Sequence, residues 1–285
     1  MRIFHTPAEM QQAALTLRRV GRRIGFVPTM GFLHEGHRSL IRLAHQHSNV
    51  VVVSLFVNPT QFGPTEDLDR YPRDLAHDEK LCRLEKTGIL FCPKAEDIYQ
   101  PRHSVYVTEE SLSRGLCGAS RPGHFRGVAT VVAKLFNMVQ PHVAVFGEKD
   151  AQQLRVIRRM VRDLNFPVEI VSGPTVREPD GLAMSSRNAN LSPEERRQAL
   201  CLRRALDRAE TLAAGGERST ETLRNAMLEV IRHSPLARVD YVDLVDEETL
   251  EPVSRIEKPV LAALAVFVGP TRLIDNTVLK PAEPA

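Results

Sequence analysis

The chain has 285 residues, of which 42% are hydrophobic and 26% are charged. This composition is typical of a globular protein and excludes a disordered chain, a collagen-like fibre and a small disulfide-stapled fold. Lys and Arg number 38 against 35 Asp and Glu, for a formal charge of +3, so net charge gives no argument for nucleic-acid binding and any anion site must be local. A chain of this length is expected to form about two domains.

The apolar pattern points away from the membrane and the secretory route. No run of about eighteen apolar residues occurs, so we expect no membrane-spanning helix. Residues 1–7 lack the unbroken apolar segment of a secretory signal, which predicts a cytoplasmic protein. The four cysteines form no Cys-x-x-Cys pair, so we expect reduced thiols rather than a zinc ribbon or a thioredoxin-type redox site.

Short apolar runs alternate with helical patterns through the first two-thirds of the chain. The runs are typical of strands that are buried on both faces of a sheet. They cover residues 24–27, 50–57, 89–91, 105–107, 143–146 and 168–171. Helical spacing predicts helices around residues 40–44, 75–84, 128–139 and 154–164. This alternation predicts an α/β fold, a Rossmann-like doubly wound parallel sheet with helices on both faces.

The pattern changes after about Val176. Residues 192–195, Ser-Pro-Glu-Glu, form a helix start signal, and we expect a long charged helix from there to Ala213 that stops at Gly215-Gly216. A helix at about 220–233 and strands at 238–245 and 260–268 follow. We therefore predict two domains, residues 1–176 and a smaller C-terminal α+β domain of residues 177–285.

The densest polar motif, Pro28 to Leu40, follows the first buried strand and opens the first helix. It therefore lies at the carboxyl end of a parallel strand, where doubly wound sheets bind ligands. Gly31 and Gly36 allow close backbone approach, and the helix N-terminus presents free amides to an anion. His34 and His37 share one face of the first turn, so their imidazoles can donate hydrogen bonds to a phosphate. The combined pattern outweighs the alternative of a surface helix on which two histidines happen to align.

A second motif, Gly147 to Gln153, follows the strand at 143–146. It also lies at the carboxyl end of a strand, so both motifs can face one crevice. Lys149 is a point charge suited to phosphate, whereas Asp150 is equally explained as a helix cap.

Two further motifs are explained either by ligand binding or by ordinary loop structure. Met184 to Asn188 places two hydroxyls beside a guanidinium, which suits a triphosphate but is also a common loop composition. In the segment 58–62, Gln61 offers an amide to a polyol or a carboxylate, and Asn58 is explained as well by stabilisation of the turn.

Other nucleotide and metal motifs are absent from the sequence. The Walker A pattern and Gly-x-Gly-x-x-Gly do not occur, which argues against a P-loop ATPase and a conventional dinucleotide dehydrogenase. A metal site at His34 and His37 has too few ligands, because the nearby sequence adds only Glu35, which points elsewhere on the turn.

Five motifs, taken in order, resemble those of the pantothenate synthetase family. They are Pro-Thr-Met-Gly-x-Leu-His-Glu-Gly-His (28–37), Phe-Val-Asn-Pro-Thr-Gln-Phe (56–62), Arg-Pro-Gly-His-Phe-Arg-Gly-Val (121–128), Gly-Glu-Lys-Asp-x-Gln-Gln (147–153) and Met-Ser-Ser-Arg-Asn (184–188). The resemblance covers nearly the whole chain, including the small C-terminal domain. Phe32 and Arg38 depart from it mildly, since small and apolar residues are usual there.

The resemblance implies an ATP-dependent ligase that joins (R)-pantoate to β-alanine. The pantoate carboxylate attacks the α-phosphate of ATP to give pantoyl adenylate and pyrophosphate, and the β-alanine amine then gives pantothenate and AMP. Mg²⁺ accompanies ATP. The family belongs with nucleotidyltransferases related in fold to class I aminoacyl-tRNA synthetases, and it suggests a homodimer.

The resemblance also implies roles for single residues. The expected catalytic residues are His37, as proton donor, His34, Lys149 and Arg187. The expected ATP-binding residues are Met30, Gly31, Phe32, Leu33, His34, Glu35, Gly36, His37, Gly147, Glu148, Lys149, Asp150, Val176, Met184, Ser185, Ser186 and Arg187. The expected substrate-binding residues are Gln61, Gln153 and Asn58. No residue is expected to hold a metal. Because an acyl adenylate is labile to water, the C-terminal domain is a candidate lid.

Two other functions stay open at this point. One is another nucleotidyltransferase, acting on a phosphorylated acceptor, against which the uncharged Gln61 and Gln153 argue. The other is a non-catalytic nucleotide sensor or an RNA-binding relative of the synthetases. Arginine clusters at residues 18–23 and 155–162 are better explained as solvated helix faces than as an RNA site, so we expect neither nucleic acid nor membrane as a partner.

Overall fold

The computed structural model describes residues 1–64 and 66–281. The chain forms two compact units. Unit 1 comprises Met1–Glu109, Arg121–Glu148 and Gln153–Val176. Unit 2 comprises Glu110–Ser120, Lys149–Gln152 and the chain from Arg177 onward.

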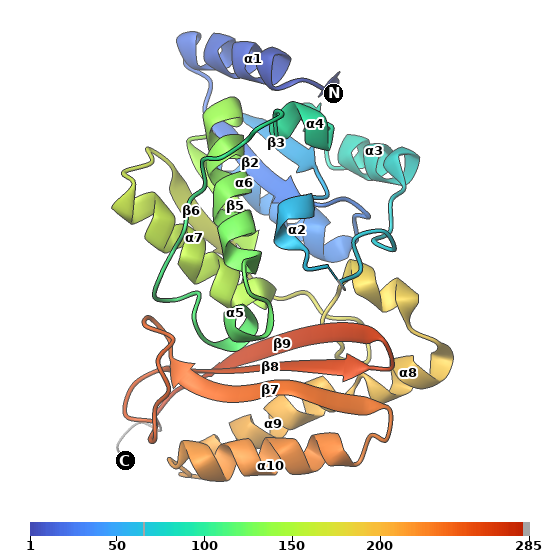
Figure 1. The fold of residues 1–285 in the computed structure, drawn as a ribbon, viewed down its shortest axis with the longest axis vertical. Helices are drawn as coiled ribbons and strands as arrows, with labels where there is room; N and C mark the ends of the chain where they lie inside the picture. Colours follow the sequence, from blue (N-terminus) through green and yellow to red (C-terminus); the bar gives the residue numbers. More distant parts are fainter. Residues whose placement is uncertain (65, 282–285) are drawn as a thin grey trace. The chain divides into compact units, whose positions relative to one another are not determined.

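Unit 1 is built on a six-stranded parallel sheet (Figure 1). Its strands are β1 (Arg2–Phe4), β2 (Ile24–Thr29), β3 (Val50–Leu55), β4 (Ile89–Phe91), β5 (Val143–Gly147) and β6 (Glu169–Gly173). Their spatial order is β1-β4-β3-β2-β5-β6. The chain order reverses between β2 and β5, so the turns that follow these two strands flank the switch point where doubly wound sheets bind ligands.

Helices cover both faces of this sheet. They are α1 (Pro7–Arg19), α2 (Glu35–His47), η1 (Pro59–Gln61), α3 (Leu75–Leu84), α4 (Ala95–Ile98), α6 (His124–Val139) and α7 (Ala151–Asp163), whose first two residues belong to unit 2. Successive residues of a strand point to opposite faces. Phe26 packs edge-on against Phe136 of α6, with ring centroids 6.4 Å apart, whereas Val27 shares a core with Ile41 of α2. The helices α6 and α2 therefore lie on opposite faces.

Unit 2 contains a three-stranded antiparallel sheet and its own helices. The strands are β7 (Ala237–Asp246), β8 (Val260–Val268) and β9 (Thr271–Leu279), and the helical segments are α5 (Leu116–Ser120), η2 (Glu148–Asp150, shared with unit 1), η3 (Ser186–Asn190), α8 (Pro193–Gln198), α9 (Cys201–Ala214) and α10 (Thr220–Arg232). Leu206 of α9, Met227 of α10 and Leu264 of β8 share one core. The predicted fold class, a doubly wound parallel sheet with a smaller α+β part, is thus confirmed.

The sequence-based prediction of the elements was wrong in some places and missed others, including the helix α1. Residues 105–107 form no strand: Val105 is 76% exposed, and the N–H of Val107 bonds to Thr130 of α6 instead of to a neighbouring strand. The strand β1 was missed because three residues are too few to establish an alternation. The strand β9 was missed because Asp275 occupies a buried position in it.

The long charged helix expected from Ser192 to Ala213 is broken into α8 and α9. The predicted helix start at Ser192 is present, as a capping box formed by Ser192 and Glu195. The helix tightens after Gln198, where the N–H of Leu202 bonds to the carbonyl of Ala199, only three residues back. The apolar pattern continues through this turn because Ala199 and Leu202 are both buried, and the sequence therefore conceals the break.

Candidate active site

The turn after β2 enters α2 through two residues in the left-handed region. Gly31 has φ 88° and Phe32 has φ 50°, and the second value is unfavourable for a residue with a bulky side chain. Asp78 of α3 compensates, because its two carboxylate oxygens accept the N–H groups of Phe32 at 2.8 Å and of Leu33 at 2.6 Å. A Cβ on residue 31 would lie 3.0 Å from that carboxylate. The glycine and Asp78 together therefore shape the turn.

The helix α3 holds this turn from a buried position. Asp78 is only 2% exposed, and burial raises its pKa although the amides of Leu33 and Phe32 favour the ionised form. The Nε2 atom of His77 lies 3.2 Å from the carbonyl oxygen of Leu33, so consecutive residues of α3 bind both the N–H and the C=O of Leu33. Sequence reasoning missed this role, since residues 75–84 displayed only a helical pattern.

His34 and His37 cap the N-terminus of α2 with their own rings. The Nδ1 of His34 accepts the N–H of Gly36 at 3.2 Å, and the Nδ1 of His37 accepts the N–H of His34 at 3.3 Å. A nitrogen that accepts carries no proton, so each neutral ring has its proton on Nε2. The ring centroids lie 4.1 Å apart. Two imidazoles with Nε2–H donors thus lie together at a helix end whose dipole favours an anion.

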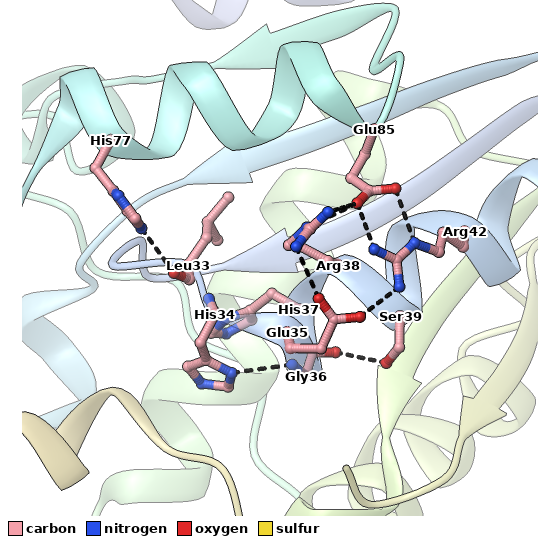
Figure 2. Close-up of polar contacts among 10 residues, drawn as sticks. All are labelled: Leu33, His34, Glu35, Gly36, His37, Arg38, Ser39, Arg42, His77 and Glu85. Carbon is pink, nitrogen blue, oxygen red and sulfur yellow. Dashed lines mark hydrogen bonds and ion pairs between the residues drawn. The ribbon is translucent and has the colours of Figure 1, made fainter. Parts of the chain in front are cut away.

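Behind the histidines, two arginines of α2 connect two carboxylates (Figure 2). Arg38 donates to Glu35 at 2.9 Å and to Glu85 of α3 at 2.7 Å. Arg42 bonds to the same two carboxylates, and its hydrogen bonds are the main reason that the pKa of Glu85 is lowered. The departure from the family motif at Arg38 therefore joins α2 to α3. The Glu35 carboxylate is thus engaged with two guanidinium groups, which leaves its backbone as the part that could bind a ligand.

The turn after β3 positions Gln61 through Asn58. Gln61 and Asn58 are 9% and 1% exposed. The Nδ2 of Asn58 donates to the Oε1 of Gln61 at 3.1 Å, while its Oδ1 accepts from the hydroxyls of Tyr99 at 2.8 Å and Thr60 at 2.9 Å. The Nε2 of Gln61 lies 3.2 Å from the Sδ of Met30, so Gln61 lies beside the turn after β2. The amide of Asn58 is engaged within the protein, which favours its turn-forming role over direct substrate contact.

The motif after β5 passes between the two units. Unit 1 contains Gly147, Glu148 and Gln153, and unit 2 contains Lys149 and Asp150. Lys149 is half-buried, and its ammonium group has no carboxylate partner within residues 1–64 and 66–281. Its carbonyl oxygen accepts the Nδ2–H of Asn276 at 2.9 Å. A held backbone with an unneutralised ammonium group suits an anionic ligand.

The motif Met184 to Asn188 forms a closed loop in unit 2. Ser185 is the N-cap of η3, and its Oγ accepts the N–H of Arg187 at 3.3 Å. The side chain of Asn188 closes the loop by donating to the carbonyl of Ala183 and to Glu178, each at 3.1 Å. Ser186 is buried, whereas Met184, Ser185 and Arg187 are half-buried.

Two side chains of the strand β9 bind segments of unit 2 that come before this loop in the chain. Its buried Asp275 accepts two hydrogen bonds from Arg177, at 2.7 and 3.0 Å, and Arg177 forms a β-bridge with Ala183 just before the motif. The next residue, Asn276, holds the carbonyl of Lys149. Consecutive residues of β9 thus hold both polar segments of unit 2. No sequence signal for this role was available, since the strand itself was missed.

Within each unit, the candidate residues are therefore partly brought together. Unit 1 gathers His34, His37 and Gln61 around the ends of β2 and β3, and it ends with the half-buried Val176. Unit 2 holds Lys149 and the loop with Arg187. That the two groups of residues meet around one ligand stays a prediction.

No group of three or more His, Cys, Asp or Glu side chains in residues 1–64 and 66–281 could hold a metal ion. Burial raises the pKa of Cys82 and Cys92 to about 12 and that of Cys201 to about 11, so these thiols stay protonated. In the same part of the chain, no helix is long and apolar enough to cross a membrane.

Comparisons with known proteins agree over nearly the whole chain. The family model described as Pantoate-beta-alanine ligase matches residues 2–278. Pantothenate synthetases from Thermotoga petrophila and Geobacter sulfurreducens are 57% and 55% identical, over 98% of this chain and 100% and 99% of theirs. The crystal structure of pantothenate synthetase from Thermus thermophilus has 47% identity and a TM-score of 0.93, and covers 99% of this chain and 100% of its own.

A second solved structure contains ligands. The pantoate-beta-alanine ligase from Francisella tularensis, complexed with beta-gamma ATP and beta-alanine, has 33% identity and a TM-score of 0.81. The match covers 98% of this chain and 97% of that one.

Proposed function

The chain belongs to the pantoate-beta-alanine ligase family, and from this premise we propose how its residues carry out the ATP-dependent condensation of pantoate with β-alanine. The single observation that carries the proposal is the pair of imidazoles at the N-terminus of α2, each with its donor on Nε2, beside the turn that holds Gln61.

The first step transfers the adenylyl group to pantoate. A carboxylate oxygen of pantoate attacks the α-phosphorus of ATP, the bond to the pyrophosphate oxygen breaks, and pantoyl adenylate forms. Negative charge builds up on the non-bridging and leaving oxygens, so donors and cations that are already in place lower the barrier. His34 and His37 supply the donors, with His37 as the proton donor. Lys149 and Arg187 supply the cations.

ATP is held mainly by backbone and hydroxyl groups. The backbone of residues 30–37 and 147–150 lies at the carboxyl ends of β2 and β5, on either side of the switch point. Val176, Met184, Ser185 and Ser186 complete this set. Mg²⁺ enters with ATP. Bound with the nucleotide, it would neutralise negative charge on the phosphate oxygens.

Pantoate is bound by the amides of Gln61 and Gln153. Gln61 is oriented by the Nδ2 of Asn58, so Asn58 acts as a positioning residue. An uncharged pair of amides fits an acceptor that carries hydroxyl and carboxylate groups but no phosphate.

The second step consumes the adenylate. The amine of β-alanine attacks the acyl carbon, the bond to the AMP oxygen breaks, and the nitrogen loses a proton. Since water competes for the same carbon, we assign unit 2 the role of a lid. A crystal structure with adenylate bound and the two units widely separated would count against that role. The homodimer and the cytoplasmic location stay predictions from the sequence.

One assay tests the function directly. The purified chain is incubated with ATP, Mg²⁺ and pantoate, with and without β-alanine, and AMP, pyrophosphate and the organic product are identified by chromatography and mass. We expect pyrophosphate release with pantoate alone and steady AMP release only with β-alanine. Adenylyl transfer to a phosphorylated acceptor, or ATP binding without turnover, would contradict the proposal.

A further inference from the structure

The segment 121–128, Arg-Pro-Gly-His-Phe-Arg-Gly-Val, leads into α6 and takes no part in the reaction described above. It lies within unit 1, far in sequence from the turn after β3. Its side chains nevertheless converge on that turn. Three sets of contacts connect it to the residues around Gln61.

The first contact is a pair of donors on one carbonyl. The Nη2 of Arg121 lies 3.2 Å and the Nδ1 of His124 lies 2.9 Å from the carbonyl oxygen of Gln61. The Nη1 of Arg121 also lies 3.1 Å from the Nε2 of His124. A guanidinium group can only donate, so that Nε2 accepts and the proton of the neutral ring is on Nδ1, facing Gln61. Both donors therefore bind the same acceptor.

The second contact fixes the guanidinium group itself. Glu66 accepts from the Nε of Arg121 at 2.7 Å and from its Nη2 at 2.6 Å. The two side chains are 13% and 24% exposed for Arg121 and Glu66. Burial raises the pKa of Glu66, but the hydrogen bonds and charge of Arg121 outweigh it, so the net pKa is lowered. The pair is thus ionised and geometrically defined.

The third contact is a close approach of two backbones. A Cβ on Gly127 would lie 2.4 Å from the carbonyl oxygen of Thr60, so only glycine allows α6 to pack against η1 here. The carbonyl of Gly127 accepts the Nδ2–H of Asn58 at 3.1 Å, and the same Nδ2 donates to the Oε1 of Gln61. The segment therefore holds the side chain of Gln61 as well as its backbone.

We propose that Arg121, Glu66 and His124 are positioning residues that orient Gln61 toward pantoate, which assigns the segment 121–128 to the pantoate site. The proposal rests on the proposed function, in which Gln61 binds pantoate. These residues act through Gln61 and touch no reacting atom. Loss of the Arg121 donor leaves His124 as the one described donor on the Gln61 carbonyl and removes the N–H that holds the Nε2 of His124. The peptide then shifts, and small displacements of a binding group are costly.

The test compares the Michaelis constants of two variants, each of which breaks one buried ion pair. Arg121→Gln is made beside Arg272→Gln, which breaks the similarly buried Arg272–Asp240 pair of unit 2 (17% and 18% exposed). We expect Arg121→Gln to raise the KM for pantoate about tenfold while the KM for ATP stays within about twofold. Arg272→Gln should leave both constants unchanged. Arg121→Lys, which retains the charge but loses the bidentate geometry, should lie between the wild type and Arg121→Gln.

A double-mutant cycle shows whether the effect passes through Gln61. In a Gln61→Ala background, where the amide is gone, Arg121→Gln should change the KM for pantoate by less than about twofold. An additional tenfold rise there, or an equal rise for ATP and pantoate in the single variant, would overturn the proposal. Should Arg121→Gln fail to fold, Glu66→Gln is measured in the same cycle with the same expectation. Absence of pantothenate formation by the wild type would instead contradict the proposed function.

Discussion

The two turns of unit 1 that carry the proposed ATP and pantoate contacts are held by opposite means. The turn after β2 is held at its N–H groups by an acceptor, the buried carboxylate of Asp78. The turn after β3 is held at a carbonyl oxygen by two donors, Arg121 and His124. In each case the holding residues belong to a region later in the chain than the helix into which the turn leads.

This difference follows from what each turn must present. A turn that offers donors to phosphate needs its own amide groups aligned, and an acceptor behind it satisfies those that do not face the ligand. A turn that offers a side-chain amide needs a fixed backbone beneath that side chain. In both turns the protein fixes the main chain, so that under the proposed function His37 and Gln61 would meet the substrate already oriented.

The largest effect is expected from removal of the donor of the first turn, the imidazole of His37. His37→Ala should slow the formation of pantoyl adenylate by about a hundredfold or more, because a proton donor and a stabiliser of charge are lost together. Single-turnover release of pyrophosphate from ATP and pantoate measures this step. His47→Ala, near the other end of the same helix, is the matched control and should leave the rate unchanged. Full single-turnover activity of His37→Ala would remove His37 from the mechanism.

Removal of the amide of the second turn should act on binding rather than on chemistry. Gln61→Ala is expected to raise the KM for pantoate by about ten- to thirtyfold, since hydrogen bonds to the substrate are lost and its polar groups stay unpaired. The KM for ATP should stay within about twofold. Asn58→Ala should give the same pattern more weakly, because Asn58 orients Gln61. Equal changes for both substrates would mean that the turn is only structural.

The support of the first turn gives a third, smaller effect. Asp78→Asn replaces one of two acceptor oxygens by an NH₂ group, so one amide of the turn at Phe32 or Leu33 loses its partner. We expect kcat to fall about tenfold while the KM for pantoate stays within about twofold. Glu79→Gln, the next residue of α3, is the control and should have no effect on either constant. A change confined to the KM for pantoate would mean that the first turn acts on pantoate binding, as the second turn is proposed to do.

Residues with a proposed chemical role could be nominated from sequence, because their types and spacing carry the signal. His34 and His37 occur where a strand gives way to a helix, and Gln61 follows the next strand. The doubly wound sheet followed from the same alternation of strands and helices. What sequence could not supply was the partner of each turn. Asp78 lies in a helix whose pattern shows only an apolar face, and nothing local marks its carboxylate as facing the turn.

The errors in the fold have related causes. The strand β9 escaped notice because its buried Asp275 is paired with Arg177, a residue 98 positions away in the chain. A charged residue interrupts the apolar pattern expected of a buried strand, and its burial is explained only once its ion-pair partner is known. Residues 105–107 misled for the opposite reason, because three apolar residues appeared strand-like although Val105 is exposed. Long-range pairing decided both outcomes, and local pattern does not encode it.

The smallest expected effect concerns the stability that Asp78 contributes. Because burial raises its pKa in the folded chain, the native state binds a proton more readily than the unfolded state, whose carboxyl titrates near pH 3.9 as in model peptides. Stability from this group is therefore fully present below about pH 3.9 and is lost as the pH rises through the raised native pKa. The measurement is the free energy of unfolding in urea, for the wild type and for Asp78→Asn, between about pH 4.5 and pH 8. As the pH rises, the wild type should lose stability relative to Asp78→Asn. Glu79→Gln should show no such trend. A shift in favour of the wild type would mean that the hydrogen bonds from the amides of Phe32 and Leu33 outweigh the effect of burial on the Asp78 carboxylate. The first turn would then be held without an electrostatic cost from the buried charge. The two turns would differ only in the direction of their hydrogen bonds.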